Sequence, residues 1–316
     1  MYNKEKELRQ MRYYSYSEYL KNKFGQKLYK LSLSIAKTCP NRDGTCGRGG
    51  CIFCSAQGSG DFAASIEKSL PQQIEEAKKR VEKKYKGSKY VAYFQSFTST
   101  HIPPETLREH LLYAANLPEI AAVSVATRAD CLGDGILEVL SEVAQIKPLT
   151  VELGLQTVHD KTAELINRCC PLPEYEKAVD NLKKIGAEVV VHVILGLPFE
   201  TPEMMLETVR YVADLKADGI KLQLLHVIRG TRLCDMYENG EFEVLSKEDY
   251  FEILADCLSI SPPQMVIHRL TGDGDKRTLV APLWSADKKR VMNDLASYLN
   301  QNDINQGSRY KQSSEA

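Results

Sequence analysis

The chain has 316 residues, of which 43% are hydrophobic and 26% are charged, and its formal net charge at pH 7 is −1. This composition is that of an ordinary globular protein with room for a large core. The charge excludes a protein that holds nucleic acid by its global charge, but it leaves room for a local basic patch. No apolar stretch reaches the length of a membrane span or forms a secretory signal, so we expect a cytoplasmic protein without a membrane partner. In that compartment the nine cysteines should be reduced thiols rather than a disulfide framework.

Six apolar, β-branched stretches recur along the chain, each followed by an amphipathic stretch of helical period. The predicted strands are 29–35, 89–94, 121–126, 149–155, 188–195 and 219–228. The predicted helices are 70–86, 104–115, 135–146, 158–167, 174–185 and 202–217. Repeated β–α units predict parallel strands with right-handed crossovers, and the apolar strands predict a sheet that is covered on both faces. The fold class is therefore α/β. Because six units are too few for a closed eight-unit barrel, it is either a partial (β/α)6 barrel or a doubly wound sheet.

The two ends of the chain differ from this pattern. We expect an N-terminal extension over residues 1–28, the repeated units over 29–260 and a C-terminal extension over 261–300 that closes the barrel. Residues 301–316 are polar, which predicts a disordered tail. Within the C-terminal extension, HRLTGDGDKRTLVAPLW predicts a last strand and a loop whose candidates for substrate contact are His268, Arg269, Asp273 and Trp284.

Four cysteines crowd the loop after the first predicted strand, CPNRDGTCGRGGCIFC. Cys51 and Cys54 form a C-x-x-C pair, a spacing that lets two thiolates reach one metal centre. Cys39 lies upstream across a long gap, and Cys46 offers a fourth thiol. On spacing alone, a four-ligand zinc site and an iron–sulfur site are equally consistent with this loop, with incidental free thiols as the third alternative.

Polar side chains occur at the ends of five further strands, where parallel α/β folds place their chemistry. These residues are Gln95, Ser96, Thr98, Arg128, Glu152, Gln156, His192, Lys221, Gln223 and His226. A single histidine in a strand is more typical of a satisfied core position. Because polar groups in apolar surroundings need partners or a ligand, the whole set predicts a polar cavity.

The order of these motifs resembles the radical S-adenosylmethionine (SAM) superfamily, and within it the YhcC/YtqA family of the Elongator-three-like branch. The resemblance extends from about Tyr19 to Trp284 and rests on CPNRDGT…GRGGCIFC, YFQSFTST, TRADC, VELGLQT, VHVILGLPFET and LLHVIRGT. It implies the partial (β/α)6 barrel and two cofactors, a [4Fe–4S] cluster and S-adenosylmethionine. The implied cluster ligands are Cys39, Cys51 and Cys54, which leave one iron open for S-adenosylmethionine. An electron from the cluster would cleave S-adenosylmethionine to a 5′-deoxyadenosyl radical.

The same resemblance implies roles for other residues by their position in the motifs. The expected cofactor-binding residues are Phe53, Gln95, Ser96, Thr98, Arg128, Glu152, Gln156, Gly196 and Pro198. The catalytic candidates, on the cavity floor or the substrate side, are His192, Gln223 and His226. Cys46 falls where relatives commonly carry another residue, so it is expected to be a loop thiol. Cys169 and Cys170 depart from the family pattern and have no assigned role.

The implied substrate is the wobble uridine of bacterial tRNA, bound through the anticodon loop. The implied reaction is of the MnmL type and converts 5-carboxymethylaminomethyl-uridine to 5-aminomethyl-uridine. Further expected partners are an electron donor such as flavodoxin or ferredoxin and a downstream tRNA methyltransferase. The alternatives are a radical SAM enzyme with a different small-molecule or RNA substrate, and a non-catalytic zinc-stabilised RNA-binding module.

Two basic clusters are candidates for phosphate contacts. The first comprises Lys78, Lys79, Arg80, Lys83, Lys84, Lys86 and Lys89. The second comprises Lys276, Arg277, Lys288, Lys289 and Arg290. Lysines at a helix C-terminus are equally typical of a solvated helix end, because they complement the helix dipole.

Overall fold

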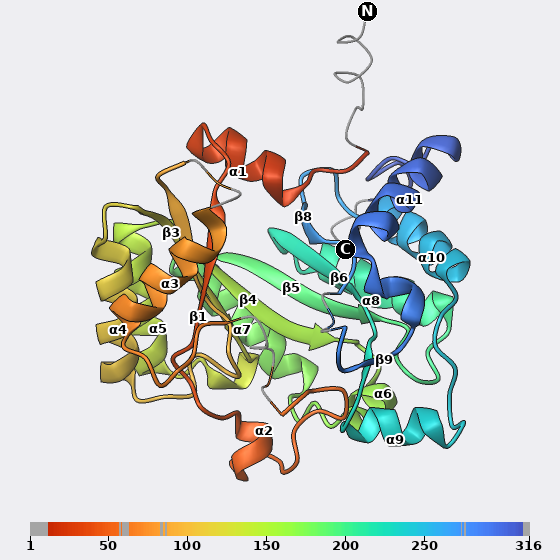
Figure 1. The fold of residues 1–316 in the computed structure, drawn as a ribbon, viewed down its shortest axis with the longest axis horizontal. Coiled ribbons are helices and arrows are strands. Elements are labelled where there is room, and N and C mark those ends of the chain that lie inside the picture. The colour runs from red at the N-terminus through yellow and green to blue at the C-terminus, as the bar shows by residue number, and fades with distance from the viewer. Residues whose placement is uncertain are drawn as a thin grey trace, which may run out of the picture.

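The computed structural model describes residues 12–56, 58, 63–82, 85, 87–272, 274 and 276–311. Its centre is a curled sheet of seven parallel strands in the order β1-β2-β3-β4-β5-β6-β8 (Figure 1). The strands are β1 (Tyr29–Leu33), β2 (Tyr90–Phe94), β3 (Ile120–Thr127), β4 (Leu149–Gln156), β5 (Glu188–Leu195), β6 (Gly219–Leu224) and β8 (Val266–Arg269). The α/β class and the partial barrel are thereby confirmed. The seventh strand, β8, lies beyond the six predicted units.

The last predicted strand, 219–228, is divided in two. Its first part is β6, whereas β7 (Val227–Ile228) leaves the sheet and pairs antiparallel with β9 (Leu279–Ala281). This small ribbon brings the C-terminal part of the chain to the carboxyl end of β6.

The helices that cover the sheet include all six that the sequence predicts. They are α3 (Leu70–Glu82), α4 (Pro104–Asn116), α5 (Asp134–Ile146), α6 (Asp160–Leu165), α7 (Leu172–Lys184) and α8 (Pro202–Asp214). Five more were not predicted: α1 (Tyr16–Phe24), α2 (Pro40–Asp43), α9 (Arg232–Glu238), α10 (Lys247–Ile260) and α11 (Lys288–Gln301). Two of them begin at a serine cap, since Ser15 accepts a hydrogen bond from the Glu18 amide and Ser246 accepts one from the Asp249 amide. None of the described helices has both the length and the apolar composition that crossing a membrane requires.

The two faces of the sheet have different chemistry because successive side chains of a strand point to opposite sides. On the convex face, strand residues such as Val151, Leu153 and Val191 pack into the main hydrophobic core with the helices. On the concave face, Glu152 and His192 line a cavity instead. The strands therefore alternate between apolar and polar surroundings, although their sequences predicted apolar cover on both sides.

The first and last described segments pack against the barrel. Helix α1 lies at the end of the sheet opposite α2 and α9 (Figure 1), and its Leu20 clusters with Val91 and Ala122. Residues 302–311, predicted to be part of a disordered tail, instead run along the end of α10. The Gln306 side chain donates hydrogen bonds to the carbonyls of Pro262 and Met265, at 2.7 and 2.8 Å. Such pairing with backbone groups orders the segment, and Ile304 and Tyr310 also pack against the main hydrophobic core. Residues 1–11 and 312–316 lie outside the described residues.

Candidate functional site

A cavity of about 360 Å³ lies at the carboxyl ends of the strands and extends down the concave face. Twelve of the fifteen predicted site residues line it: Cys39, Cys51, Phe53, Cys54, Gln95, Thr98, Arg128, Glu152, Gln156, His192, Gln223 and His226. The other three, Ser96, Gly196 and Pro198, are not among its lining residues. The Ser96 hydroxyl is buried against that of Ser34, at 2.8 Å, which explains why it does not reach the cavity. The sequence thus predicted one common site, and the structure brings most of its members together.

The cysteine loop begins with a short helical turn. The Cys39 carbonyl accepts from the amides of Arg42 and Asp43, at 2.8 and 3.2 Å, and the turn ends at Gly44 with φ +95°. The Arg42 guanidinium then reaches across the loop and donates to the carbonyl of Cys54, at 3.2 Å. A Cβ on Gly50 would lie 2.9 Å from Arg42 Nε, so glycine at this position leaves room for that crossing. The loop is therefore shaped by its own glycines and arginine.

The thiols of this loop match the donor set of an iron–sulfur cluster with three protein ligands. Cys39, Cys51 and Cys54 are in no disulfide and line the same cavity. Burial raises the pKa of Cys51 to about 12, and the positive charge of bound iron would reverse that effect. Among the described residues, no three Cys, His, Asp or Glu side chains converge as ligands of a single metal ion. Cys46 is exposed, does not line the cavity and accepts a hydrogen bond from the Arg128 guanidinium, at 3.7 Å.

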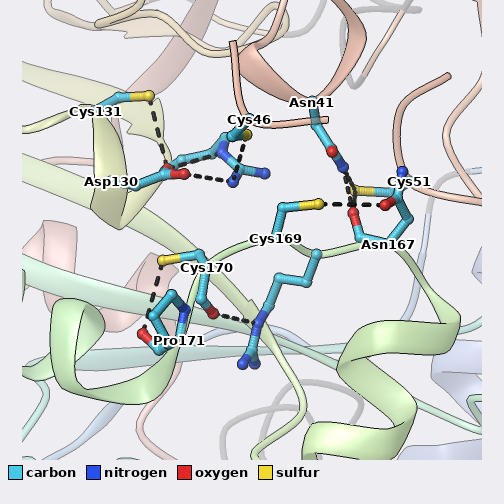
Figure 2. A network of polar contacts seen from close by, with 11 residues as sticks. Asn41, Cys46, Cys51, Asp130, Cys131, Asn167, Cys169, Cys170 and Pro171 are labelled. Atoms are coloured by element: carbon cyan, nitrogen blue, oxygen red, sulfur yellow. Dashed lines mark hydrogen bonds and ion pairs between the residues drawn. The ribbon is translucent and has the colours of Figure 1, made fainter. Parts of the chain in front are cut away.

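A segment far along the chain fixes this loop in place (Figure 2). The Asn41 side chain donates to the carbonyl of Asn167 and lies 3.5 Å from Cys51 Sγ. The side-chain amide of Asn167 donates to the carbonyls of Arg48 and Gly50, at 3.2 and 2.9 Å. Asn167 has φ +59°, a conformation that asparagine tolerates better than most residues. Sequence reasoning missed both asparagines, and the only signal was an Asn as the last residue of the predicted helix 158–167.

Two further cavity residues are held by local geometry. Arg128 is clamped by Asp130 of the same TRADC motif, with Nε–Oδ1 and Nη2–Oδ2 distances of 2.9 and 2.6 Å. Gln156 has φ +63°, and a Cβ on Gly154 would lie 2.5 Å from its Nε2 atom. Gly154 therefore leaves room for the Gln156 side chain at the cavity wall.

The floor of the cavity is organised around the buried carboxylate of Glu152. Lys30 and Ser124 donate to its Oε1 atom, at 2.8 and 3.2 Å. Tyr93 donates to Oε2 at 2.6 Å, and the Lys221 ammonium contacts the same oxygen. His192 Nε2 lies 3.0 Å from Oε2. Glu152 is thus occupied by five neighbours rather than open to a ligand.

These contacts set the charges on the floor. Burial alone would raise the pKa of Glu152, but the charges of Lys221 and Lys30 hold it well below its ordinary value. Burial lowers the pKa of Lys221 to about 7, although Glu152 opposes this effect. Burial and the charge of Lys221 together lower the pKa of His192 to about 4. His192 is therefore neutral at physiological pH. Sequence reasoning missed Tyr93 and gave Lys221 no role.

The predicted substrate contacts of the C-terminal extension separate in the structure. Arg269 lines the cavity, whereas His268 stacks on Tyr16 with ring centroids 4.2 Å apart. Trp284 donates its Nε1–H to the carbonyl of Leu245, at 3.1 Å, and does not line the cavity. Asp273 lies outside the described residues.

The two basic clusters also differ. In the first, Lys78 is paired with Glu75 and Glu119, both at 2.8 Å, and Lys83, Lys84 and Lys86 lie outside the described residues. In the second, Lys276 and Arg277 are exposed and follow the cavity-lining Gly274. Lys276 and Arg277 are therefore the members of the two clusters that directly follow a cavity-lining segment.

Comparisons with known proteins agree with this architecture. The family model of the radical SAM superfamily matches residues 35–212, and that of the radical SAM C-terminal domain matches residues 217–301. The protein YtqA of Bacillus subtilis is 45% identical over 296 residues, which cover 94% of this chain and 92% of YtqA. The tRNA uridine(34) acetyltransferase of Methanocaldococcus jannaschii is 29% identical over 155 residues, covering 48% of this chain and 28% of that protein. The solved structure of Elp3 from Methanocaldococcus infernus covers 88% of this chain and 64% of its own, with a TM-score of 0.69 and 18% identity.

Proposed function

The chain belongs to the radical SAM superfamily, in the family of YtqA and YhcC, and from this premise we propose that it modifies the wobble uridine of bacterial tRNA. It is a radical SAM enzyme, and its family uses a [4Fe–4S] cluster and S-adenosylmethionine. The proposed reaction is an oxidative removal of the carboxymethyl group of 5-carboxymethylaminomethyl-uridine. The carbon between the amine and the carboxylate would lose a hydrogen atom to the deoxyadenosyl part of S-adenosylmethionine and one electron to the cluster. Water would then hydrolyse the resulting imine to 5-aminomethyl-uridine and glyoxylate. When bound, the two cofactors supply one-electron chemistry that takes a hydrogen atom from an unactivated carbon.

One observation carries the proposal: three thiols of one loop, none of them in a disulfide, line the same cavity as the polar side chains from the other strand ends. The choice of substrate is supported by the partial similarity to a relative whose name specifies uridine 34 of tRNA. A wobble base can be turned out of its loop into such a cavity, as is common when proteins act on RNA bases.

We assign the cavity residues to the two cofactors. Cys39, Cys51 and Cys54 hold the cluster, and the cavity keeps it apart from bulk water. The proposed contacts of S-adenosylmethionine are Phe53 with the adenine, Gln95 and Thr98 with the amino group, and Arg128 and Gln156 with the ribose or carboxylate. Because Ser96, Gly196 and Pro198 do not line the cavity, they are left out of this proposal.

Glu152 was expected to bind the cofactor, and we propose a positioning role for it instead. Its carboxylate is engaged by five neighbours, so we assign it to hold Lys221 and His192 in place. His192, Gln223 and His226 stay candidates for the substrate side. Glycines at 272 and 274 leave room for His226, since Cβ atoms there would lie 2.6 and 2.9 Å from its ring.

The proposal includes partners and domains. Residues 29–260 would carry the cofactor site, and residues 261–300 would complete the substrate side, which the cavity-lining Arg269 and Gly272 support. The exposed Lys276 and Arg277 would contact phosphates of the anticodon loop. A flavodoxin or ferredoxin would supply electrons, and a tRNA methyltransferase would act on the product.

A non-catalytic zinc-stabilised module is not supported. That alternative needs Cys46 as the fourth ligand, and the structure places this exposed thiol beside Arg128 and outside the cavity.

Mass spectrometry of tRNA nucleosides from cells that lack this gene tests the proposed function. We expect 5-carboxymethylaminomethyl-uridine to accumulate and its methylaminomethyl descendant to disappear. Expression of the wild-type chain in these cells should restore the normal nucleoside profile, whereas expression of the Cys51→Ala variant should not. A profile that is unchanged by the deletion would reject the proposal.

A further inference from the structure

Two lysines share one carboxylate on the cavity floor. Lys30 comes from β1 and Lys221 from β6, and both contact Glu152 on β4. The Glu152 side chain is fully buried, and that of Lys221 is 6% exposed. His192 is neutral, so it contributes no charge. With Lys221 protonated, these three side chains carry one more positive than negative charge.

An excess of charge in a buried cluster is costly, because the interior solvates an ammonium group poorly. The structure shows this cost at Lys221, whose pKa is lowered to about 7 by burial. An anion next to Lys221 would balance the cluster and raise that pKa again.

Lys221 is the lysine that a ligand can reach. It lines the cavity, whereas Lys30 is not among the lining residues. An ammonium group has three N–H donors, and the contacts of Lys221 with Glu152 and with the Tyr93 hydroxyl, at 3.1 Å, account for two. The third is available to a ligand in the cavity. Arg269, the register partner of Lys221 on β8, lines the cavity as well.

We propose that Lys221 binds a carboxylate of the substrate at the floor of the cavity. This inference rests on the proposed function, in which the substrate carries a carboxylate beside its protonated amine and the product keeps only the protonated amine. Lys221 would then attract the carboxylate of the substrate, whereas the product offers it a cation with no carboxylate to compensate. The same pair of interactions would favour release of the product.

Equilibrium binding to two anticodon stem–loop RNAs tests the proposal. The RNAs differ only at the wobble position, which is 5-carboxymethylaminomethyl-uridine in one and 5-aminomethyl-uridine in the other. The full chain is reconstituted with iron and sulfide without oxygen and used without a reductant, so that no turnover occurs. We expect the wild-type chain to prefer the carboxylated RNA and Lys221→Met to weaken its binding roughly 10- to 100-fold, the range of a hydrogen bond to a charged group. Binding of the aminomethyl RNA should not weaken.

Two variants and one further ligand complete the test. Lys221→Arg keeps the charge and should keep most of the preference for the carboxylated RNA. This prediction can be tested even if thermal unfolding shows that Lys221→Met is unstable. Lys177→Met, at an exposed position of α7, is the matched control and should bind as the wild type does. The carboxylate of S-adenosylmethionine is the other possible source of an anion, so its binding is measured with the same variants.

The inference is overturned if the wild type shows no preference, if Lys221→Met weakens both RNAs equally, or if it weakens S-adenosylmethionine alone. The proposed function is judged separately, from the cellular tRNA profile, so a failure of one can be told from a failure of the other.

Discussion

The side chain of Asn41 donates a hydrogen bond to the carbonyl of Asn167, 126 residues further along the chain (Figure 2). The side-chain amide of Asn167 donates hydrogen bonds to the carbonyls of Arg48 and Gly50 in the same loop as Asn41. The loop that carries Cys39, Cys51 and Cys54 is therefore tied to the segment that follows α6. This tie holds the cysteine loop against that segment.

Removal of this tie should weaken the cluster site more than the fold. We expect Asn167→Ala to retain the protein's secondary structure but to lose iron several-fold faster to a chelator after reconstitution. Loss of two hydrogen bonds would cost about 1–3 kcal/mol, which a protein of this size can tolerate. Asn116→Ala is the control, because Asn116 donates only to its own helix, at the carbonyl of Leu112. Equal rates of iron loss in the two variants would show that the tie does not support the cluster.

The cysteines of the loop should fall into two groups. Alanine at Cys39, Cys51 or Cys54 should abolish the brown colour and reduce bound iron and sulfide from about four each per chain to a small fraction. Alanine at Cys46 should leave both unchanged, since this thiol is exposed and lies outside the cavity. Iron and sulfide analysis after anaerobic reconstitution measures both outcomes. A cluster that depends on Cys46 would contradict this ligand set.

Two substitutions on the cavity floor should lower the free energy of unfolding by different amounts. Glu152→Gln leaves the buried Lys221 and the half-buried Lys30 without their carboxylate, and loss of a buried partner typically costs about 3–5 kcal/mol. Lys221→Met should cost clearly less, because Lys30 and the neutral donors still satisfy Glu152. Urea unfolding of the metal-free chain compares the two free energies. Equal losses would mean that Lys221, rather than Glu152, is the centre of the network.

His192 should resist protonation. Its pKa is lowered to about 4 by burial and by the charge of Lys221, with Arg269 acting in the same direction and Glu152 opposing them. The folded-state pKa lies below the unfolded value, so protonation of His192 favours the unfolded chain. The free energy of unfolding therefore decreases only as the pH falls from about 6.5 towards 4. Nitrogen NMR should show a neutral ring with its proton on Nε2, towards Glu152, unchanged from pH 8 to about pH 5.5. A titration near pH 6.5 would contradict this environment.

The local patterns of the sequence were sufficient for the barrel and for most of the cavity. Apolar stretches such as 188–195 and glycine-rich turns carry information within a few residues, so six β–α units and the cysteine loop were predictable. The tie between Asn41 and Asn167 was not, because it depends on two segments that only the fold brings together. The sharing of Glu152 by Lys30 and Lys221 depends on the register of three strands, which periodicity does not determine. Ser96 was predicted to bind the cofactor, but its hydroxyl pairs with that of Ser34, just after β1, instead of reaching the cavity.

The most direct test of the account is a single reaction. The anaerobically reconstituted chain is mixed with S-adenosylmethionine, a reductant and tRNA that carries 5-carboxymethylaminomethyl-uridine, and both 5′-deoxyadenosine and the tRNA nucleosides are measured. The account predicts that 5-aminomethyl-uridine and 5′-deoxyadenosine form together, and that neither forms with Cys51→Ala. Release of 5′-deoxyadenosine without any change in the wobble nucleoside would contradict the proposed substrate, and release of neither would contradict the site itself.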